Sequence, residues 1–239
     1  MNKPFKFKQF TIHQDQCAMK IGTDGVLLGA WTKISSFSNS ILDVGTGTGV
    51  IALMLAQRSN AHTIDAVEIN PNAYEQCVEN FENSSWNDRL FCYHADFKDF
   101  AEEIDDKYDL ITCNPPYFEA SGEKNKMSSD RKTARFKNTL SFEELIKGVS
   151  ILLSEKGNFA VIIPFENQKE FIALANQYNL YCNFLTDVKG HKNAPFKRSL
   201  LQFSFEKQSL KKEELVIEIE RHIYTKEYID LTKDFYLKM

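Results

Sequence analysis

The residues with the clearest potential for chemistry follow one another at positions 113 to 118, Cys-Asn-Pro-Pro-Tyr-Phe. Proline fixes its own φ and has no N–H for a strand ladder, so two prolines make a stiff stop after the apolar run 108–112. Such stiffness is useful where polar atoms and a ring must stay in place during a reaction. We therefore take Asn114, Pro115, Pro116 and Tyr117 as candidate catalytic residues.

This turn suits the activation of a planar amine, such as the exocyclic nitrogen of adenine or an amide nitrogen. The lone pair of such a nitrogen is delocalised, which makes it a poor nucleophile. The side-chain oxygen of Asn114 and the carbonyl oxygen of Pro115 could accept its two hydrogens and free the lone pair, because fixed acceptors stabilise developing charge. Tyr117 or Phe118 offers a face on which a flipped base could stack. No strong general base is needed.

A second candidate site is the glycine-rich stretch at residues 42–53, Leu-Asp-Val-Gly-Thr-Gly-Thr-Gly-Val-Ile-Ala-Leu. Glycines let a backbone turn tightly and approach a ligand closely, and a loop of this kind before a helix is typical of nucleotide sites. The next predicted strand ends at Glu68, nineteen residues after Gly49, where an acceptor for ribose hydroxyls belongs. A Rossmann dehydrogenase is the best-known owner of a glycine triplet, but no residues for a nicotinamide site are evident.

These residues need a parallel sheet to bring them to one edge, and the chain predicts one. Apolar runs predict buried strands, and helical patterns separate them. The predicted strands are 41–44, 63–68, 90–93, 109–113 and 159–163, and the predicted helices are 50–58, 71–81, 141–153 and 166–178. Residues 184–189 and 199–205 predict a hairpin. The fold class is thus α/β, a Rossmann-like, doubly wound, mostly parallel sheet with an antiparallel C-terminal hairpin at its edge.

Both ends of the chain have weaker patterns. Residues 5–12 alternate with a slip, which predicts one strand with a bulge. A short helix is expected at 26–31, and a further strand at 215–219 precedes a last helix. We expect residues 1–239 to form a single domain, with 1–40 and 213–239 as N- and C-terminal extensions.

Composition narrows the class of protein. Of the 239 residues 43% are hydrophobic, and no apolar run approaches the ~20 residues of a membrane span. The start of the chain has no signal-peptide pattern. Five scattered cysteines favour a reducing cytoplasm over a disulfide framework or a zinc site. The five histidines are also far apart, so we expect no metal.

The net charge of −4 does not favour a polyanion, but the charge is uneven. The segment 119–140, which follows the proline turn, contains six cations against three acids, and the hairpin carries Lys192, Lys197 and Arg198. Such cations either keep the surface soluble or contact RNA phosphates near the site. Taken together they favour RNA contact.

The order Asp-x-Gly-x-Gly-x-Gly at 43–49 resembles the first motif of class I S-adenosylmethionine-dependent methyltransferases. That resemblance implies S-adenosyl-L-methionine as the cofactor. Glu68 would hold the ribose hydroxyls, Ile69 would pack on the adenine, and Asp96 would accept from the adenine amino group; Asp96 also begins an acidic stretch that could simply be solvated. The implied cofactor-binding residues of the loop are Asp43, Gly45, Thr46, Gly47 and Gly49.

Asn-Pro-Pro-Tyr matches the fourth motif of amino-methyltransferases that act on adenine, cytosine or glutamine. Over essentially the whole chain, four stretches resemble one bacterial family, which N6-methylates the adenosine immediately 3′ of the anticodon in a valine tRNA: FKFKQFTIHQDQCAMKIGTDGVLLGAW, RKTARFKNTLSFEELI, NAPFKRSLLQF and RHIYTKEYIDLTKDFYLKM. This resemblance implies a tRNA substrate and a monomeric cytoplasmic enzyme. Thr23 would touch the methionine carboxylate, or would merely cap a helix. Arg131 and Arg135 would contact RNA, although Phe136 stands where the family pattern has histidine.

Three alternatives remain open. The first is N5-glutamine methylation of a translation factor, which would need a small helical domain where only about forty residues precede Asp43. The second is an amino-methyltransferase of rRNA. The third is a catalytically silent RNA-binding relative, against which an intact Asn114 and glycine loop argue.

Overall fold

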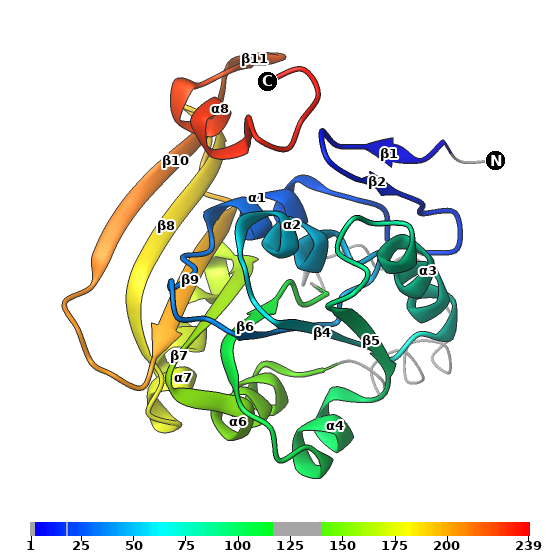
Figure 1. Ribbon diagram of the computed structural model, residues 1–239. Coiled ribbons are helices and arrows are strands. Elements are labelled where there is room, and N and C mark those ends of the chain that lie inside the picture. The colour runs from blue at the N-terminus through cyan, green and yellow to red at the C-terminus, as the bar shows by residue number, and fades with distance from the viewer. Residues whose placement is uncertain (1–2, 18, 117–139) are drawn as a thin grey trace, which may run out of the picture.

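The computed structural model describes residues 3–17, 19–116 and 140–239. Its centre is a nine-stranded sheet of order β11-β10-β8-β9-β7-β6-β3-β4-β5 (Figure 1). The strands are β3 (Ser40–Val44), β4 (Thr63–Glu68), β5 (Leu90–His94), β6 (Tyr108–Cys113), β7 (Leu153–Pro164), β8 (Tyr181–His191), β9 (Arg198–Ser204), β10 (Lys211–Glu220) and β11 (Ile223–Tyr224). The helices are α1 (Thr23–Trp31), α2 (Val50–Arg58), α3 (Pro71–Glu82), α4 (Phe97–Glu103), α6 (Phe142–Leu152), η1 (Phe165–Asn167), α7 (Gln168–Gln177) and α8 (Lys226–Thr232).

Helices cover both faces of the sheet, which confirms the predicted doubly wound α/β class. In Figure 1, α1, α2 and α3 lie above the sheet, and α4, α6 and α7 lie below it. Successive strand residues enter opposite cores: Ile162 packs in the cluster with α1 and α2, and Ile163 in the cluster with α6 and α7. This two-sided burial explains why the central strands are continuous apolar runs in the sequence.

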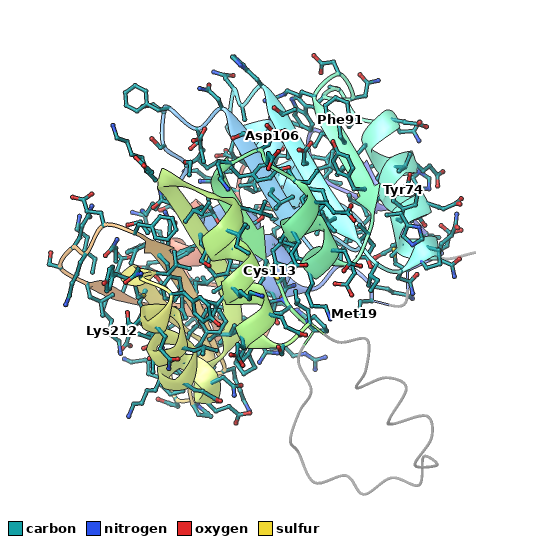
Figure 2. The ribbon with its side chains drawn as sticks, turned by 90° about the horizontal axis from the view of Figure 1, so that it is seen from below. Met19, Tyr74, Phe91, Asp106, Cys113 and Lys212 are labelled. Carbon is teal, nitrogen blue, oxygen red and sulfur yellow. The ribbon has the colours of Figure 1, made fainter. Side chains whose placement is uncertain are left out.

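The central strands bring the candidate residues to one edge. β3 pairs in parallel with both β4 and β6, and β4 pairs in parallel with β5. The carboxyl ends of β3, β4, β5 and β6 therefore meet at the same rim, where ligands of open α/β sheets bind. Figure 2 shows Cys113, the last residue of β6, near Met19 on this side, with Asp106 toward the opposite end.

The N-terminal prediction is wrong in detail. Residues 5–12 do not form one bulged strand; they form an antiparallel pair, β1 (Phe5–Lys6) and β2 (Thr11–Ile12), in a separate two-stranded sheet. The slip in the alternation marks the turn between these strands. Phe7 bridges to Tyr236 near the C-terminus, so the two ends of the chain pack together.

Two further differences concern the predicted hairpin and a helix after β5. The predicted hairpin, β8 and β9, is confirmed, but it is not at the edge, because β10 pairs in parallel with β8 and β11 follows it. The second difference is α4, which sequence analysis missed. Its seven residues carry three acids, and the acidic composition concealed the apolar face of Phe97, Phe100 and Ala101.

Candidate functional site

A cavity of about 320 Å³ lies at the carboxyl edge of the sheet, in the size range of small-molecule sites. Its wall combines residues from the glycine loop, the ends of β4 and β6, and the segment before α1. The sequence-predicted residues that line it are Gly45, Thr46, Gly47, Glu68, Ile69, Asp96, Asn114, Pro115 and Pro116. The fold thus brings the two motifs, about seventy residues apart in the sequence, to one hollow.

The glycine loop is held open by its own backbone. Gly45, Gly47 and Gly49 all have positive φ, a conformation that favours glycine. The N–H groups of Gly45 and Thr46 donate to the carbonyl of Val67. A Cβ added at Gly45 or Gly47 would meet no atom within 4 Å, whereas at Gly49 it would lie 2.6 Å from the Phe81 ring. Gly49 therefore serves packing against α3, and the other two border the cavity.

Asp43 supports the loop from below. Its side chain is fully buried and is not part of the cavity wall. The hydroxyl of Thr46 donates to one carboxylate oxygen at 2.6 Å, and the hydroxyl of Thr112 donates to the other at 2.9 Å. The carboxylate thus ties the glycine loop to β6, which makes it a support of the site instead of a ligand contact.

We expect the buried charge of Asp43 to make stability depend on pH. Burial raises the pKa of Asp43 to about 6, although hydrogen bonds from Thr46 and Thr112 oppose the rise. The folded state then binds a proton more tightly than the unfolded state, so this group's contribution to stability is lost as pH rises toward 6. Between pH 4.5 and pH 7, the free energy of unfolding of the wild type should fall by roughly 2 kcal/mol relative to Asp43→Asn. Urea titrations of both proteins measure it; parallel pH curves would contradict the prediction.

Glu68 joins the end of β4 to the glycine loop. It is 8% exposed, and its carboxylate accepts from the N–H of Gly47 at 2.9 Å and from the N–H of Asn70 at 2.8 Å. Ile69 follows on the cavity wall and is 45% exposed, a large apolar surface for a ligand to cover. His94 contacts the carbonyl of Ile69 through Nε2 at 3.1 Å, which fixes the backbone there.

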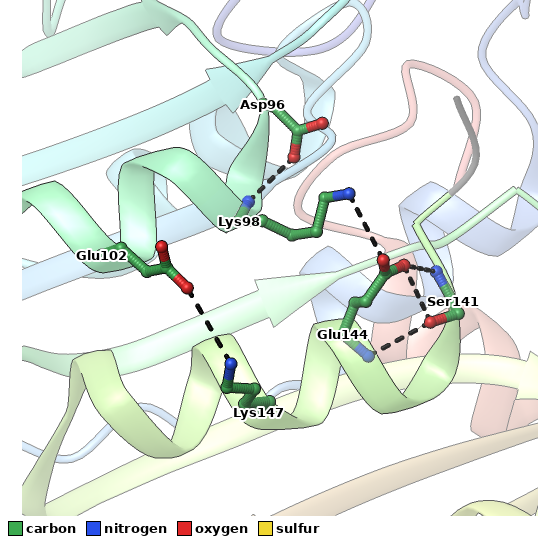
Figure 3. A network of polar contacts seen from close by, with 6 residues as sticks. All are labelled: Asp96, Lys98, Glu102, Ser141, Glu144 and Lys147. Carbon is green, nitrogen blue, oxygen red and sulfur yellow. Dashed lines mark hydrogen bonds and ion pairs between the residues drawn. The ribbon is translucent and has the colours of Figure 1, made fainter. Parts of the chain in front are cut away.

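Asp96 has a second task besides facing the cavity. It caps α4, where its carboxylate accepts from the N–H of Lys98 at 2.9 Å (Figure 3). The ammonium of Lys98 lies 3.3 Å from Glu144, which forms a capping box with Ser141 at the start of α6. Hydrogen bonds from Ser141 lower the pKa of the Glu144 carboxyl, and Lys98 adds to this effect. The contacts tie the first turn of α6 to the cavity wall.

Asn114, Pro115 and Pro116 follow β6 directly and line the cavity. Gly25 of α1 lets this helix pack closely against α2, since a Cβ there would lie 3.3 Å from Val50; the same Cβ would be in ordinary contact with Nδ2 of Asn114, at 3.9 Å. The amide therefore packs close to the first turn of α1. Tyr117, the remaining member of the motif, lies outside the described residues.

Thr23 is placed differently from the rest. It is the first residue of α1 and is not part of the cavity wall, and Gly22 instead occupies the N-cap position. Its neighbours Gly22 and Gly25 do line the cavity. The alternative role of Thr23, as the helix cap, is therefore also wrong.

The cavity wall includes residues that sequence analysis missed. The largest group precedes α1 and consists of Cys17, Met19, Lys20, Ile21 and Gly22. This group has no helix or strand period, so periodicity did not indicate it, although it lies within the first of the four stretches that resemble the tRNA-methylating family. Phe97 and Lys98 were missed together with α4, although Asp96 as a helix-capping residue could have indicated them.

The predicted RNA-binding residues are only partly described. Lys192 and Lys197 are exposed between β8 and β9, whose carboxyl and amino ends respectively meet at the cavity side of the sheet. Arg198 differs, because its guanidinium forms an ion pair with Asp24 of α1 at 2.7 Å. Arg131 and Arg135, with the rest of the cationic segment up to residue 139, lie outside the described residues.

Two kinds of feature are absent from the described residues. Within 3–17, 19–116 and 140–239, no three His, Cys, Asp or Glu side chains are grouped so that they could hold a metal ion. In the same described ranges, no helix has the length and apolar character that crossing a membrane requires.

Comparisons with known proteins identify close relatives. A family model described as Methyltransferase small domain matches residues 21–172. A protein of Christiangramia forsetii named tRNA1(Val) (adenine(37)-N6)-methyltransferase is 57% identical over 241 residues, covering 100% of this chain and 99% of that protein. A Flavobacterium psychrophilum protein of the same name is 57% identical over 235 residues, 98% of this chain and 100% of its own. A solved structure, titled a predicted O-methyltransferase from Agrobacterium tumefaciens, has a TM-score of 0.68 at 19% identity, covers 89% of this chain and 96% of that chain, and shares the fold.

Proposed function

Because the chain belongs to the tRNA1(Val) (adenine(37)-N6)-methyltransferase family, we propose that it transfers a methyl group from S-adenosyl-L-methionine to N6 of an adenosine. The adenosine is the one immediately 3′ of the anticodon in a valine tRNA. The observation that carries the proposal is a single cavity shared by Gly47, Glu68 and Asn114. In this proposal, a nucleoside-type ligand bound in the cavity lies beside two acceptors suited to a planar amine.

The residues of the cavity fit this cofactor. Gly45 and Gly47 leave open space where any Cβ would intrude, as a ligand lying on the loop requires. Glu68 offers acceptors for ribose hydroxyls, Ile69 an apolar surface for an adenine ring, and Asp96 an acceptor for its amino group. When bound, S-adenosylmethionine supplies an activated methyl group on its sulfonium.

The chain's own part in the reaction is positioning. The Asn114 amide oxygen and the Pro115 carbonyl accept hydrogen bonds from the N6 amine, which draws its lone pair out of the ring. Pro115 and Pro116 restrict the backbone, so the acceptors need no reorganisation as charge develops. Tyr117 stacks on the flipped base. Holding the amine in line with the methyl group accounts for most of the rate enhancement, because positioning replaces a bimolecular encounter.

Gly49, which packs against α3, and Gly47, which lines the cavity, give a testable contrast. Gly49→Ala forces a Cβ against Phe81 at positive φ, and we expect it to lower the free energy of unfolding by about 2–3 kcal/mol. Gly47→Ala meets no protein atom, so it should cost only about 1 kcal/mol of stability. Its Cβ instead occupies ligand space, and we expect S-adenosylmethionine to bind on the order of tenfold more weakly. Urea titration and calorimetry measure the pair. Equal losses of stability in Gly49→Ala and Gly47→Ala would contradict the assignment of Gly49 to packing and of Gly47 to the ligand space.

Lys192 and Lys197 contact tRNA phosphates in this proposal, together with Arg131 and Arg135. Both lysines are exposed on the cavity side of the sheet, which supports this contact with RNA. We also propose that residues 1–239 act as one domain and as a cytoplasmic monomer. The pairing of β10 with β8 supports the single domain, since the C-terminal extension continues the central sheet.

The function is tested by incubating the protein with labelled S-adenosylmethionine and total tRNA, followed by nucleoside analysis. We expect N6-methyladenosine in valine tRNA. A matched transcript with guanosine in place of the adenosine 3′ of the anticodon should take up no label. Label in protein and none in RNA would favour N5-glutamine methylation, and label in rRNA the rRNA alternative.

A further inference from the structure

The strap before α1, defined as residues 13–17 and 19–22, forms one wall of the cavity without regular secondary structure. Helices and strands hold their shape through backbone hydrogen bonds, but the strap has none of these ladders. One hydrogen bond joins its two ends: the Ile21 N–H donates to Oε1 of Gln14 at 3.0 Å. Something else must fix the strap against the rest of the cavity.

Asn80 of α3 supplies the strongest attachment. Its side chain is 1% exposed and makes three hydrogen bonds. Oδ1 accepts from the N–H of His13 at 2.8 Å, and Nδ2 donates to the carbonyl of His13 at 2.9 Å. Nδ2 also donates to the carbonyl of Thr48 at 2.9 Å. One amide thus joins the start of the strap to the glycine loop, which forms another part of the cavity wall.

A second amide extends the attachment. Gln76 lies one turn earlier on α3, on the same face as Asn80, and is fully buried. Its Oε1 accepts from the N–H of Gln16 at 3.1 Å. The next strap residue, Cys17, is 8% exposed and lies on the cavity wall. The two amides therefore fix the strap immediately before the residues that face the ligand.

We propose that Asn80 is a positioning residue, which holds the strap and the glycine loop at a fixed separation for S-adenosylmethionine. The identity of the ligand rests on the proposed function. A buried amide suits the task because its acceptor and its two donors satisfy three backbone groups at once. Loss of the amide leaves these groups unpaired and loosens the strap, while Asn114 and Pro115 keep their places after β6. The affinity for cofactor then falls, and the chemical step at saturating cofactor does not.

The experiment compares Asn80→Ala and the isosteric Asn80→Asp with Asn83→Ala, whose side chain is exposed at the end of the same helix. Asn80→Asp keeps an acceptor for His13 but places a carboxylate oxygen against two carbonyls. The first readout is the rate of Cys17 alkylation by iodoacetamide, followed by mass spectrometry and compared with Cys182 on β8. The second readout compares the change in KM for S-adenosylmethionine with the change in kcat on tRNA. Calorimetry gives the Kd for S-adenosylmethionine.

In both Asn80 variants we expect Cys17 alkylation, Kd and KM to rise on the order of tenfold, with kcat nearly unchanged and Asn83→Ala like the wild type. Cooperative melting shows that a variant is folded. If Asn80→Ala does not fold, Asn80→Asp provides the test. Unchanged Cys17 alkylation and Kd in a folded Asn80 variant would overturn the proposal. An equal rise for Cys182 would also overturn it, because the effect would then be global. A wild type that binds no S-adenosylmethionine would instead refute the proposed function, and Cys17 alkylation would still test the attachment.

Discussion

Asn114→Ala is expected to lower the rate of methyl transfer to tRNA by roughly 10²- to 10³-fold, the scale seen when one positioned polar group is lost from a reaction centre. The amide oxygen is one of two acceptors that the turn presents to the amine. Without it, the Pro115 carbonyl alone must polarise the nitrogen. Cofactor binding depends on the glycine loop and Glu68, so the Kd for S-adenosylmethionine should stay nearly unchanged.

Single-turnover methylation of tRNA measures the chemical step, and calorimetry measures cofactor binding. Asn87→Ala is a matched control, because that asparagine is exposed and is not part of the cavity wall. Asn114→Asp retains an oxygen acceptor, and we expect it to keep more activity than the alanine variant. A wild-type single-turnover rate in Asn114→Ala would exclude this side chain from the methyl transfer step.

The parts of the site that sequence analysis predicted are those fixed by backbone geometry. Buried parallel strands read as apolar runs, and each run ends at the sheet edge where Glu68 or Asn114 lies. Positive φ at Gly45 and Gly47 restricts the residue type, which made the loop visible in the sequence. Strand ends and glycine turns are local features, so their spacing alone indicated a shared rim.

What escaped prediction depends on contacts distant in sequence. Asn80, which holds the strap, is 67 residues from His13, and nothing near His13 signals that contact. The parallel pairing of β10 with β8 likewise depends on packing in the folded sheet. A helix between two strands is the usual sequence signal for parallel pairing, and none separates these two. The role of Asp43 was also hidden. An acid before a glycine loop reads as a ligand contact, but Asp43 is fully buried outside the cavity wall, and the hydroxyls of Thr46 and Thr112 donate to its two oxygens.

Glu68→Ala is expected to weaken S-adenosylmethionine binding by about 10²- to 10³-fold, because charge-assisted hydrogen bonds contribute about 1.5–3 kcal/mol each. Two effects add up in this variant. The proposed ribose hydroxyls lose their acceptor, and the N–H of Gly47 loses the carboxylate that holds it at 2.9 Å. The turn after β6 is untouched, so kcat at saturating cofactor should fall much less than the affinity.

Glu68→Gln separates the two effects, because it preserves the volume and one acceptor oxygen. Its amide nitrogen must face the N–H of either Gly47 or Asn70, so one of the two loop contacts becomes repulsive. We expect a Kd between those of the wild type and Glu68→Ala. Glu75→Gln, on the exposed face of α3, controls for the loss of one negative charge. Calorimetry at constant ionic strength gives the four Kd values, and melting curves without cofactor report damage to the fold. An unaltered Kd in a folded Glu68→Ala protein would show that the carboxylate neither orders the loop for the cofactor nor binds its ribose.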